Sequence, residues 1–298
     1  MRTKLLLLAA LAGVLPWTRG SAQSGSTDSL TLDVYTADSS GFGVTSTLIY
    51  GPTEAILVDA QFLLSDAQRL ADRIAATGRH LKAIFITHAH PDHYFGLATL
   101  RKRFRSVPIY MSPAALEEFK RTVSEKIATW SAVYGPEIPT EVPTPLPLPS
   151  RRFTIDGHAV EVVSGIQGDA ATPTNSYVWV PSLGAQIQGD LVYDQVHVWL
   201  AESDSSTRAA WRETLRRLSA QKPKTAVAGH KRSPDLPNSP DAIAFTTRYI
   251  ADFEAARATA QNADELIAAV KQKHPDLGLE AILTFAARAA FPAAAPTP

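Results

Sequence analysis

Four side chains that can bind a metal ion lie within six positions of one segment, Thr87-His-Ala-His-Pro-Asp-His93. His88 and His90 are two residues apart, so on an extended backbone both imidazoles project to the same side. Asp92 and His93 come after a turn at Pro91 and can reach the same cavity from a second direction. The whole chain has eight histidines, and three of them are here. The segment therefore predicts a metal site rather than a polar loop.

Three further residues that could serve this site follow predicted strands directly. Asp190 and His230 each come after a strand and one glycine, and Asp59 ends a strand in a similar way. A glycine lets the backbone pass close to a crowded centre. In open α/β sheets, ligand sites collect outside the carboxyl ends of the strands. We therefore expect these residues to meet the histidine segment at one edge of a sheet.

The elements that must position these residues form two successive halves, each with strands and then helices. In the first half, strands are predicted at 30–35, 43–50, 55–58, 82–87 and 107–111, and helices at 65–76, 94–104 and 113–134. In the second half, a hairpin is predicted at 153–163, strands at 176–180, 185–188 and 225–228, and helices at 206–220, 241–260 and 263–289. Ser65 is the expected N-cap of its helix. Two such halves packed sheet against sheet, with the helices outside, give one α/β domain.

The three motifs in this order resemble the metallo-β-lactamase superfamily, over about residues 30–230. The motifs are His88-x-His90-x-Asp92-His93, Gly189-Asp190 and Gly229-His230. The resemblance implies a four-layer αββα sandwich of the metallo-β-lactamase type, here with extra C-terminal helices. It also implies two divalent metal ions, most commonly zinc. By this resemblance His88 and His90 hold the first metal, and Asp92, His93 and His230 hold the second. Asp190 bridges the two, and Asp59 supports the ligands from behind.

The chain departs from the family pattern at one ligand of the first metal. The family has a third histidine there, and the corresponding stretch of this chain, residues 165–172, contains none. Asp169 falls where that histidine is expected, and a carboxylate can bind zinc. Gln167 is a second candidate and a poorer zinc ligand, and a third reading is that the loop supplies no ligand. A carboxylate in place of an imidazole would also favour manganese or iron.

The chemistry implied is hydrolysis by a metal-bound hydroxide, formed because a cation lowers the pKa of bound water from ~16 toward ~7. The expected substrates are small esters, lactones, thioesters or amides, including β-lactams. Asp92 could carry a proton to the leaving group. Tyr193 is spaced after Asp190 like a tyrosine that donates to the developing oxyanion in lactonases of this superfamily. Its alternative role is packing at the end of a strand.

Two other functions remain open on the sequence. A mononuclear iron dioxygenase of the same fold would use His88, His90 and one carboxylate. A non-catalytic metal-binding protein would have lost the first site. Four aromatic residues are candidate walls of a partly apolar pocket for a small-molecule substrate: Phe62, Phe95, Trp130 and Trp199. No basic stripe is visible in the sequence, which argues against a nucleic-acid partner.

The first residues have the layout of a secretory signal, with basic residues, the apolar run 5–15 and small residues up to Ala22. The predicted organisation is a signal peptide at 1–22, a polar spacer at 23–29, the domain with its helical extension at 30–289, and a frayed tail at 290–298. We therefore expect a periplasmic or secreted protein with no membrane insertion after cleavage. The chain has no cysteine, so its core alone must stabilise it. The sequence does not indicate an oligomeric state.

Overall fold

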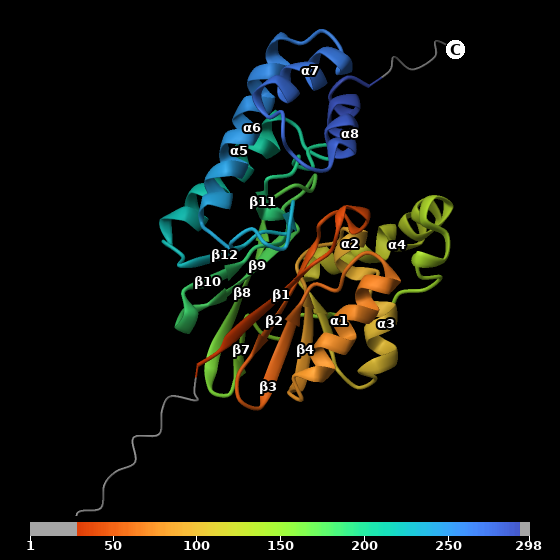
Figure 1. Ribbon diagram of the computed structural model, residues 1–298, viewed down its shortest axis with the longest axis vertical. Helices are drawn as coiled ribbons and strands as arrows, with labels where there is room; N and C mark the ends of the chain where they lie inside the picture. Colours follow the sequence, from red (N-terminus) through yellow and green to blue (C-terminus); the bar gives the residue numbers. More distant parts are fainter. Residues whose placement is uncertain (1–28, 293–298) are drawn as a thin grey trace, which may run out of the picture.

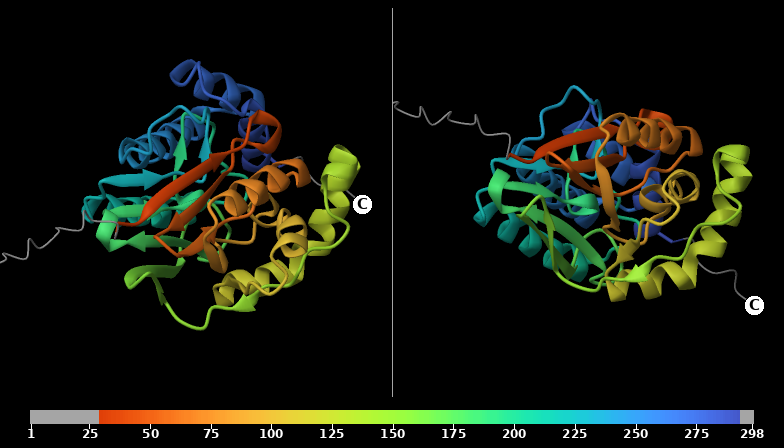
Figure 2. Two further views of the ribbon diagram at one scale, coloured as in Figure 1. Left: turned by 60° about the horizontal axis from the view of Figure 1, so that its bottom comes forward. Right: turned by 90° about the horizontal axis from the view of Figure 1, so that it is seen from below.

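The computed structural model describes residues 29–292. Two β-sheets lie against each other, and helices cover the outer face of each (Figures 1 and 2). This confirms the predicted αββα sandwich with additional C-terminal helices. The predicted signal peptide and nearly all of the spacer lie outside the described residues, as does most of the predicted tail. Within the described part, no helix combines the length and apolar character needed to cross a membrane.

The first sheet has six strands in the order β1-β2-β3-β4-β5-β6. Antiparallel pairing joins β1, β2 and β3, and parallel pairing joins β3 through β6. The strands are β1 (Thr31–Thr36), β2 (Thr45–Tyr50), β3 (Glu54–Val58), β4 (His80–Ile86), β5 (Ile109–Met111) and β6 (Leu146–Pro147). The helices of this half are α1 (Leu64–Ala76), α2 (Pro91–Tyr94), α3 (Leu97–Arg103) and α4 (Pro113–Tyr134).

The second sheet has the order β12-β10-β9-β8-β7, and β11 pairs separately with β13. The strands are β7 (Arg152–Ile155), β8 (His158–Ile166), β9 (Asn175–Val180), β10 (Ala185–Ile187), β11 (Tyr193–Asp194), β12 (Thr225–Val227) and β13 (His230–Lys231). The helices are α5 (Ser205–Ala220), α6 (Asp241–Thr259), α7 (Ala263–Lys273) and α8 (Glu280–Ala290). Short 3₁₀ turns lie at Ser39–Gly41, Gly135–Glu137, Pro181–Leu183 and Gly189–Leu191.

Strand β3 shows how the layers form, because successive side chains of a strand point to opposite faces. Ile56 and Val58 pack in the core between the two sheets, and Ala55 and Leu57 pack in the core under the helices of the first half. All four are buried. A strand covered on both faces has an almost continuous apolar sequence. The last residues of β3 and β4, Val58 and Ile86, are buried, so both strands end in the protein interior. Their carboxyl ends are where Asp59 and the histidine segment begin.

Three details of the predicted helices are wrong. The N-cap of α1 is Leu63 rather than Ser65, and it makes no side-chain cap hydrogen bond. The helix expected from Tyr94 begins at Pro91, since proline suits the first helical position, and it is interrupted at Gly96, whose N–H donates to the carbonyl of Gln61. The single helical stretch expected at 263–289 is two helices, because the chain turns between Pro275 and Leu279.

Candidate metal centre

The histidine segment changes from extended to helical backbone within a few residues. His90 is the N-cap of α2, with extended φ and ψ of −87° and 140°, and Pro91 opens the helix. His88 and His90 therefore lie on the extended part that continues β4, and Asp92 and His93 lie on the first helical turn. The segment presents its four side chains from two directions, as the sequence predicts, and His88 and His93 are completely buried.

The first cluster consists of His88, His90, Asp169 and Asp190. His90 Nδ1 is 3.0 Å from Asp169 Oδ2 and 3.8 Å from Asp190 Oδ2. His88 Nε2 is 3.6 Å from the same oxygen of Asp190. Four residues from three separate parts of the chain thus bring one ligand atom each to a common point.

The second cluster consists of Asp92, His93, Asp190 and His230. His93 Nε2 is 2.9 Å from Asp190 Oδ1 and 3.7 Å from Asp92 Oδ2. His230 Nε2 is 3.2 Å from Asp92 Oδ2 and 3.2 Å from Asp190 Oδ2. Asp190 belongs to both clusters, with one oxygen near His93 and the other near the remaining histidines. The approach of His230 to Asp190 requires Gly229, where a Cβ would lie 2.3 Å from Asp190 Oδ1.

Two observations indicate that both clusters could hold divalent metal ions. Ligands about 2.0–2.1 Å from a tetrahedral ion are about 3.3 Å from one another, and the distances within the clusters run from 2.9 to 3.8 Å. In addition, Nε2 of His88 and His93 and Oδ1 of Asp190 are buried without a hydrogen-bond partner among the described residues. Buried polar atoms are normally satisfied, and a bound cation would satisfy these.

The electrostatics of the site also favour cations. Burial alone would lower the pKa of His90 and His93, but the neighbouring carboxylates outweigh it and raise both well above the usual range. For His90 these are Asp169 and Glu202. Burial acts against His230 as well, and Asp190 and Asp92 raise its pKa to about 10. Metal binding would displace the protons that these rings hold in the metal-free protein.

Two groups outside the clusters orient the imidazole rings of His93 and His230. Asp59 accepts a hydrogen bond from His93 Nδ1 at 2.9 Å and from the Thr87 backbone N–H at 2.8 Å. The Phe42 carbonyl oxygen accepts from His230 Nδ1 at 2.8 Å. Because Nδ1 of both rings is engaged in this way, Nε2 is left to face the site. Asp59 therefore has the supporting position that the family resemblance implies.

Replacing Asp59 by Asn should weaken metal binding at the second cluster by about 10- to 100-fold, the usual effect of losing such a support. Asn tolerates the left-handed backbone of Asp59 (φ 62°), so the change removes the carboxylate without straining the chain. Metal titration monitored by calorimetry would measure the effect. Asp33→Asn, which alters a surface ion pair with Arg73, is the control. Equal metal affinity in both variants would contradict the role of Asp59.

Asp169 occupies the position of the predicted third ligand and is fully buried. Asn175 Nδ2 donates to its Oδ1 at 2.9 Å, and the Tyr193 hydroxyl oxygen lies 3.2 Å from its Oδ2. The other candidate, Gln167, directs its amide nitrogen to the carbonyls of Gly168 and Ala170 in its own loop. Of the two candidates, Asp169 is the one that the fold brings to the cluster.

Tyr193 lies between the two clusters. Its hydroxyl donates to Asp190 Oδ2 at 2.8 Å, and its ring stacks on His230 at a centroid distance of 5.1 Å. Burial, and then the charges of Asp169 and Asp190, raise the pKa of this phenol well above its usual value. Tyr193 is therefore a protonated hydrogen-bond donor at neutral pH, and it reaches the site rather than only packing at the end of its strand.

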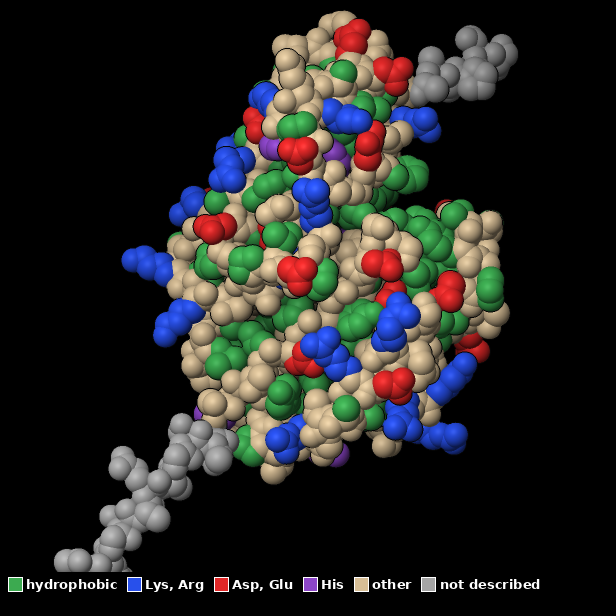
Figure 3. Space-filling model, in the orientation of Figure 1, with side chains coloured by type: hydrophobic (Ala, Val, Ile, Leu, Met, Phe, Trp, Pro, Cys, Tyr) green, Lys and Arg blue, Asp and Glu red, His purple; other side chains and the backbone are tan. Residues whose placement is uncertain are grey.

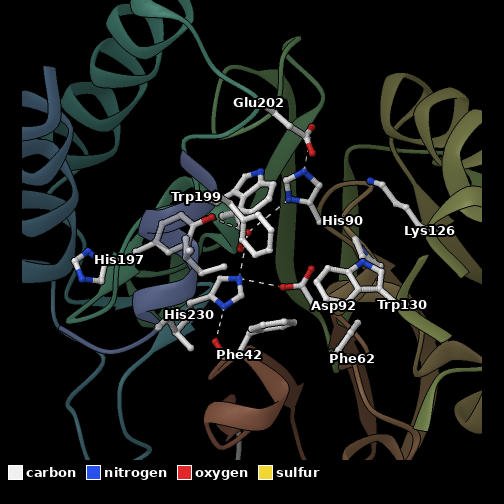
Figure 4. Close-up of a pocket in the computed structure, with 16 residues that line it drawn as sticks. Phe42, Phe62, His90, Asp92, Lys126, Trp130, His197, Trp199, Glu202 and His230 are labelled. Carbon is white, nitrogen blue, oxygen red and sulfur yellow. Dashed lines mark hydrogen bonds and ion pairs between the residues drawn. The ribbon is translucent and has the colours of Figure 1, made fainter. Parts of the chain in front are cut away.

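The clusters open into a cavity of about 200 Å³. Figure 4 shows His90, Asp92 and His230 on its floor, with aromatic side chains around them. Three of the four predicted aromatic walls line it: Phe62, Trp130 and Trp199. The fourth, Phe95, is behind the wall, where it stacks on Phe62. The sequence did not single out several other lining residues: Phe42, Lys126, Glu202, Leu279, Ile282 and Phe285.

Comparisons with known proteins agree with this geometry. A family model described as the metallo-beta-lactamase superfamily matches residues 40–230. No curated protein matches the chain.

Among solved structures, the chain is similar to a metallo-beta-lactamase from Pontibacter korlensis, at 19% identity and a TM-score of 0.53, over 76% of this chain and 96% of that one. It is similar to DIM-1 metallo-beta-lactamase, at 18% identity and a TM-score of 0.54, over 74% of this chain and 92% of that one. It also resembles a metallo-beta-lactamase family protein from Thermus thermophilus, at 20% identity and a TM-score of 0.59, over 88% and 91% of the two chains. At these identities the structural likeness shows the fold.

Proposed function

The chain belongs to the metallo-β-lactamase superfamily of metal-dependent hydrolases, and from that premise we propose that it cleaves a small ester, lactone, thioester or amide. The observation that carries the proposal is the pair of His/Asp clusters that share Asp190 at the floor of a largely apolar cavity. A cavity of this size and character suits a small, partly apolar substrate. β-Lactams are included because they are cyclic amides and because similar structures are described as β-lactamases.

We propose two divalent ions, with zinc as the first choice. The second cluster has two histidines and two carboxylates, a common zinc environment. In the first cluster, Asp169 adds a harder oxygen ligand, which makes manganese or iron acceptable as well. When bound, such ions would polarise the scissile carbonyl and lower the pKa of a water nucleophile.

The residues of the chain would perform the remaining steps. The Tyr193 hydroxyl donates to Asp190 in this structure, and once Asp190 binds metal the hydroxyl would be free to donate to the oxygen charge that develops on the substrate. One such donor can contribute a few kcal/mol. Asp92 lines the cavity and is the more exposed of the two carboxylates in the second cluster, so we assign it the transfer of a proton to the leaving group. The aromatic wall would exclude water and hold the apolar part of the substrate.

We also propose that the protein is exported to the periplasm or secreted. The support is the sequence of residues 1–22, with its basic start, apolar run and small residues before Ala22. Fractionation of cells that express the full chain, with detection of a product shortened at its N-terminus, would test this localisation.

The iron dioxygenase alternative is less well supported. Such an enzyme needs one cluster of two histidines and one carboxylate, and here a complete second cluster lies beside the first. The non-catalytic alternative would leave the cavity above both clusters without a role. A metal analysis that finds one iron and no zinc in protein purified without added metal would reverse this preference.

The proposed function is tested by turnover. The purified protein, loaded with zinc or manganese, is assayed with aryl esters, lactones, thioesters and a chromogenic cephalosporin. We expect hydrolysis of at least one class, and the same protein with His88→Ala, which lacks a ligand of the first cluster, should hydrolyse it more slowly. Absence of hydrolysis for all classes with either metal would overturn the proposal.

Removal of the metals should abolish turnover and destabilise the fold. A ligand that binds only the folded state stabilises it by about 2.7 kcal/mol when present at 100 times its Kd. We therefore expect the chelated protein to melt several degrees lower, with both properties restored by added zinc. Differential scanning calorimetry with and without chelator measures the shift. A chelated protein that melts at the same temperature would show that the clusters hold no metal.

A further inference from the structure

Lys126 brings a positive charge to the wall of the cavity. It lies on α4, and its Nζ donates to the Ala89 carbonyl oxygen at 2.8 Å. Within residues 29–292, no carboxylate oxygen lies within 4.0 Å of this nitrogen. Burial lowers its pKa, and the largest opposing effect is the more distant charge of Glu202. A desolvated ammonium without a contacting anion is unfavourable, and an ammonium group has three protons to donate.

A hydrogen-bond donor without a partner lines the same cavity. The indole Nε1–H of Trp199 is buried and has no hydrogen-bond partner among the described residues. The Trp199 ring lies 6.3 Å from the ring of His90, and Lys126 contacts the residue before His90. In the view of Figure 4, Trp199 and Lys126 lie on either side of His90. The acidic residue on this side, Glu202, is directed to His90 Nε2 at 3.5 Å. Among the described residues, Lys126 Nζ thus bonds only a neutral carbonyl and pairs with no carboxylate, and Trp199 Nε1 has no acceptor.

The other walls of the cavity are apolar. Trp130 lies on α4, and Ile282 and Phe285 lie on α8, across the opening. Phe285 is 49% exposed although it is a large hydrophobic residue, and it contacts Trp199 at a centroid distance of 5.9 Å. Figure 3 shows hydrophobic side chains on both sides of the hollow between α8 and α4. Helix α8 lies beyond residues 40–230, the region matched by the family model.

We propose that the substrate is an anionic amphiphile: its carboxylate accepts hydrogen bonds from Lys126 Nζ and Trp199 Nε1, and its apolar body packs between α4 and α8. This proposal rests on the proposed function and narrows its substrate class. The competing role for Lys126 is that of a clamp: its hydrogen bond to the Ala89 carbonyl would fix the loop that carries His88 and His90. A clamp would affect metal binding and treat charged and neutral ligands alike, so the two roles make different predictions.

The test is binding of two unreactive probes, 4-phenylbutyrate and its neutral analogue 4-phenylbutyramide, to the zinc-loaded protein by calorimetry. Lys126→Met should weaken binding of the carboxylate by about 10- to 100-fold, the value of a charge-assisted hydrogen bond, and leave the amide within about threefold. Lys126→Arg should retain most of the carboxylate affinity. Trp199→Phe, which keeps a ring and removes the N–H, should also weaken the carboxylate selectively. Lys120→Met, an exposed lysine of the same helix, is the matched control.

Two results would overturn the proposal. Carboxylate affinity that is unchanged in Lys126→Met would mean that the anion binds elsewhere, for example on the metal ions. Equal weakening of both probes, together with reduced zinc content, would assign Lys126 to the clamp. Binding is measured without turnover, so the two proposals can fail separately. A protein that binds the carboxylate more tightly than the amide through Lys126, but hydrolyses none of the substrates, would contradict the proposed function and still support the recognition of the anion.

Discussion

Asp190→Asn should reduce kcat/KM by at least about 1,000-fold, the largest effect expected from any single substitution in this chain. One carboxylate serves both clusters, with Oδ1 at 2.9 Å from His93 Nε2 and Oδ2 at 3.2 Å from His230 Nε2. Replacing it by a neutral amide removes a charge from both sites at once. The electrostatic contribution of catalytic metals is several kcal/mol, and each 1.36 kcal/mol is tenfold in rate.

The measurement combines turnover with metal content. The asparagine variant should hold fewer metal ions after dialysis than the unchanged protein, and high zinc concentrations should restore only part of the activity. Asp194→Asn is the control, because Asp194 is half-buried, four residues further along the chain, and belongs to neither cluster. If Asp190→Asn keeps both its metal and its rate, then the two clusters do not act as one centre.

The residues of the clusters could be predicted because they follow strands whose positions are clear in the sequence. β3, β4, β10 and β12 each end in an apolar residue, and a residue that follows such a strand lies at the edge of its sheet. The glycines before Asp190 and His230 added a second signal, and the structure shows why one of them is needed, since a Cβ at Gly229 would meet Asp190. The local sequence therefore indicates both where the ligand residues lie and that His230 and Asp190 approach each other closely.

The walls of the cavity could not be predicted in the same way. Lys126 lies in the middle of a long helix, where a lysine is normally solvated, and only the packing of α4 over the Ala89 loop makes it line the site. Ile282 and Phe285 lie about 190 residues after the histidine segment on a helix whose start the sequence did not show. Contacts between elements that are distant in the sequence depend on how the layers pack, and a local sequence pattern does not predict that packing. For the same reason Phe95 and Phe62 could not be distinguished, although one is behind the wall and the other forms it.

Asp169→Ala should produce the second largest effect, the selective loss of the first metal. The carboxylate is 3.0 Å from His90 Nδ1, and a hydrogen bond from Asn175 holds it in place. Without it the first cluster keeps His88, His90 and the shared Asp190, and we expect metal content to fall to about one ion per chain. If both metals are needed to polarise the substrate and supply the nucleophile, kcat/KM should fall by about 100-fold or more.

Two further substitutions separate the charge of Asp169 from its shape. Asp169→Asn retains an oxygen for the hydrogen bond from Asn175 but removes the negative charge, so it should resemble the alanine variant in metal content. Asp169→His supplies the ligand that the family pattern has, and it should shift the ratio of zinc- to manganese-supported activity toward zinc by about tenfold, since an imidazole is the softer ligand. If all three variants keep two metals and unchanged rates, the loop donates no ligand, and the first metal depends on His88, His90 and Asp190 alone.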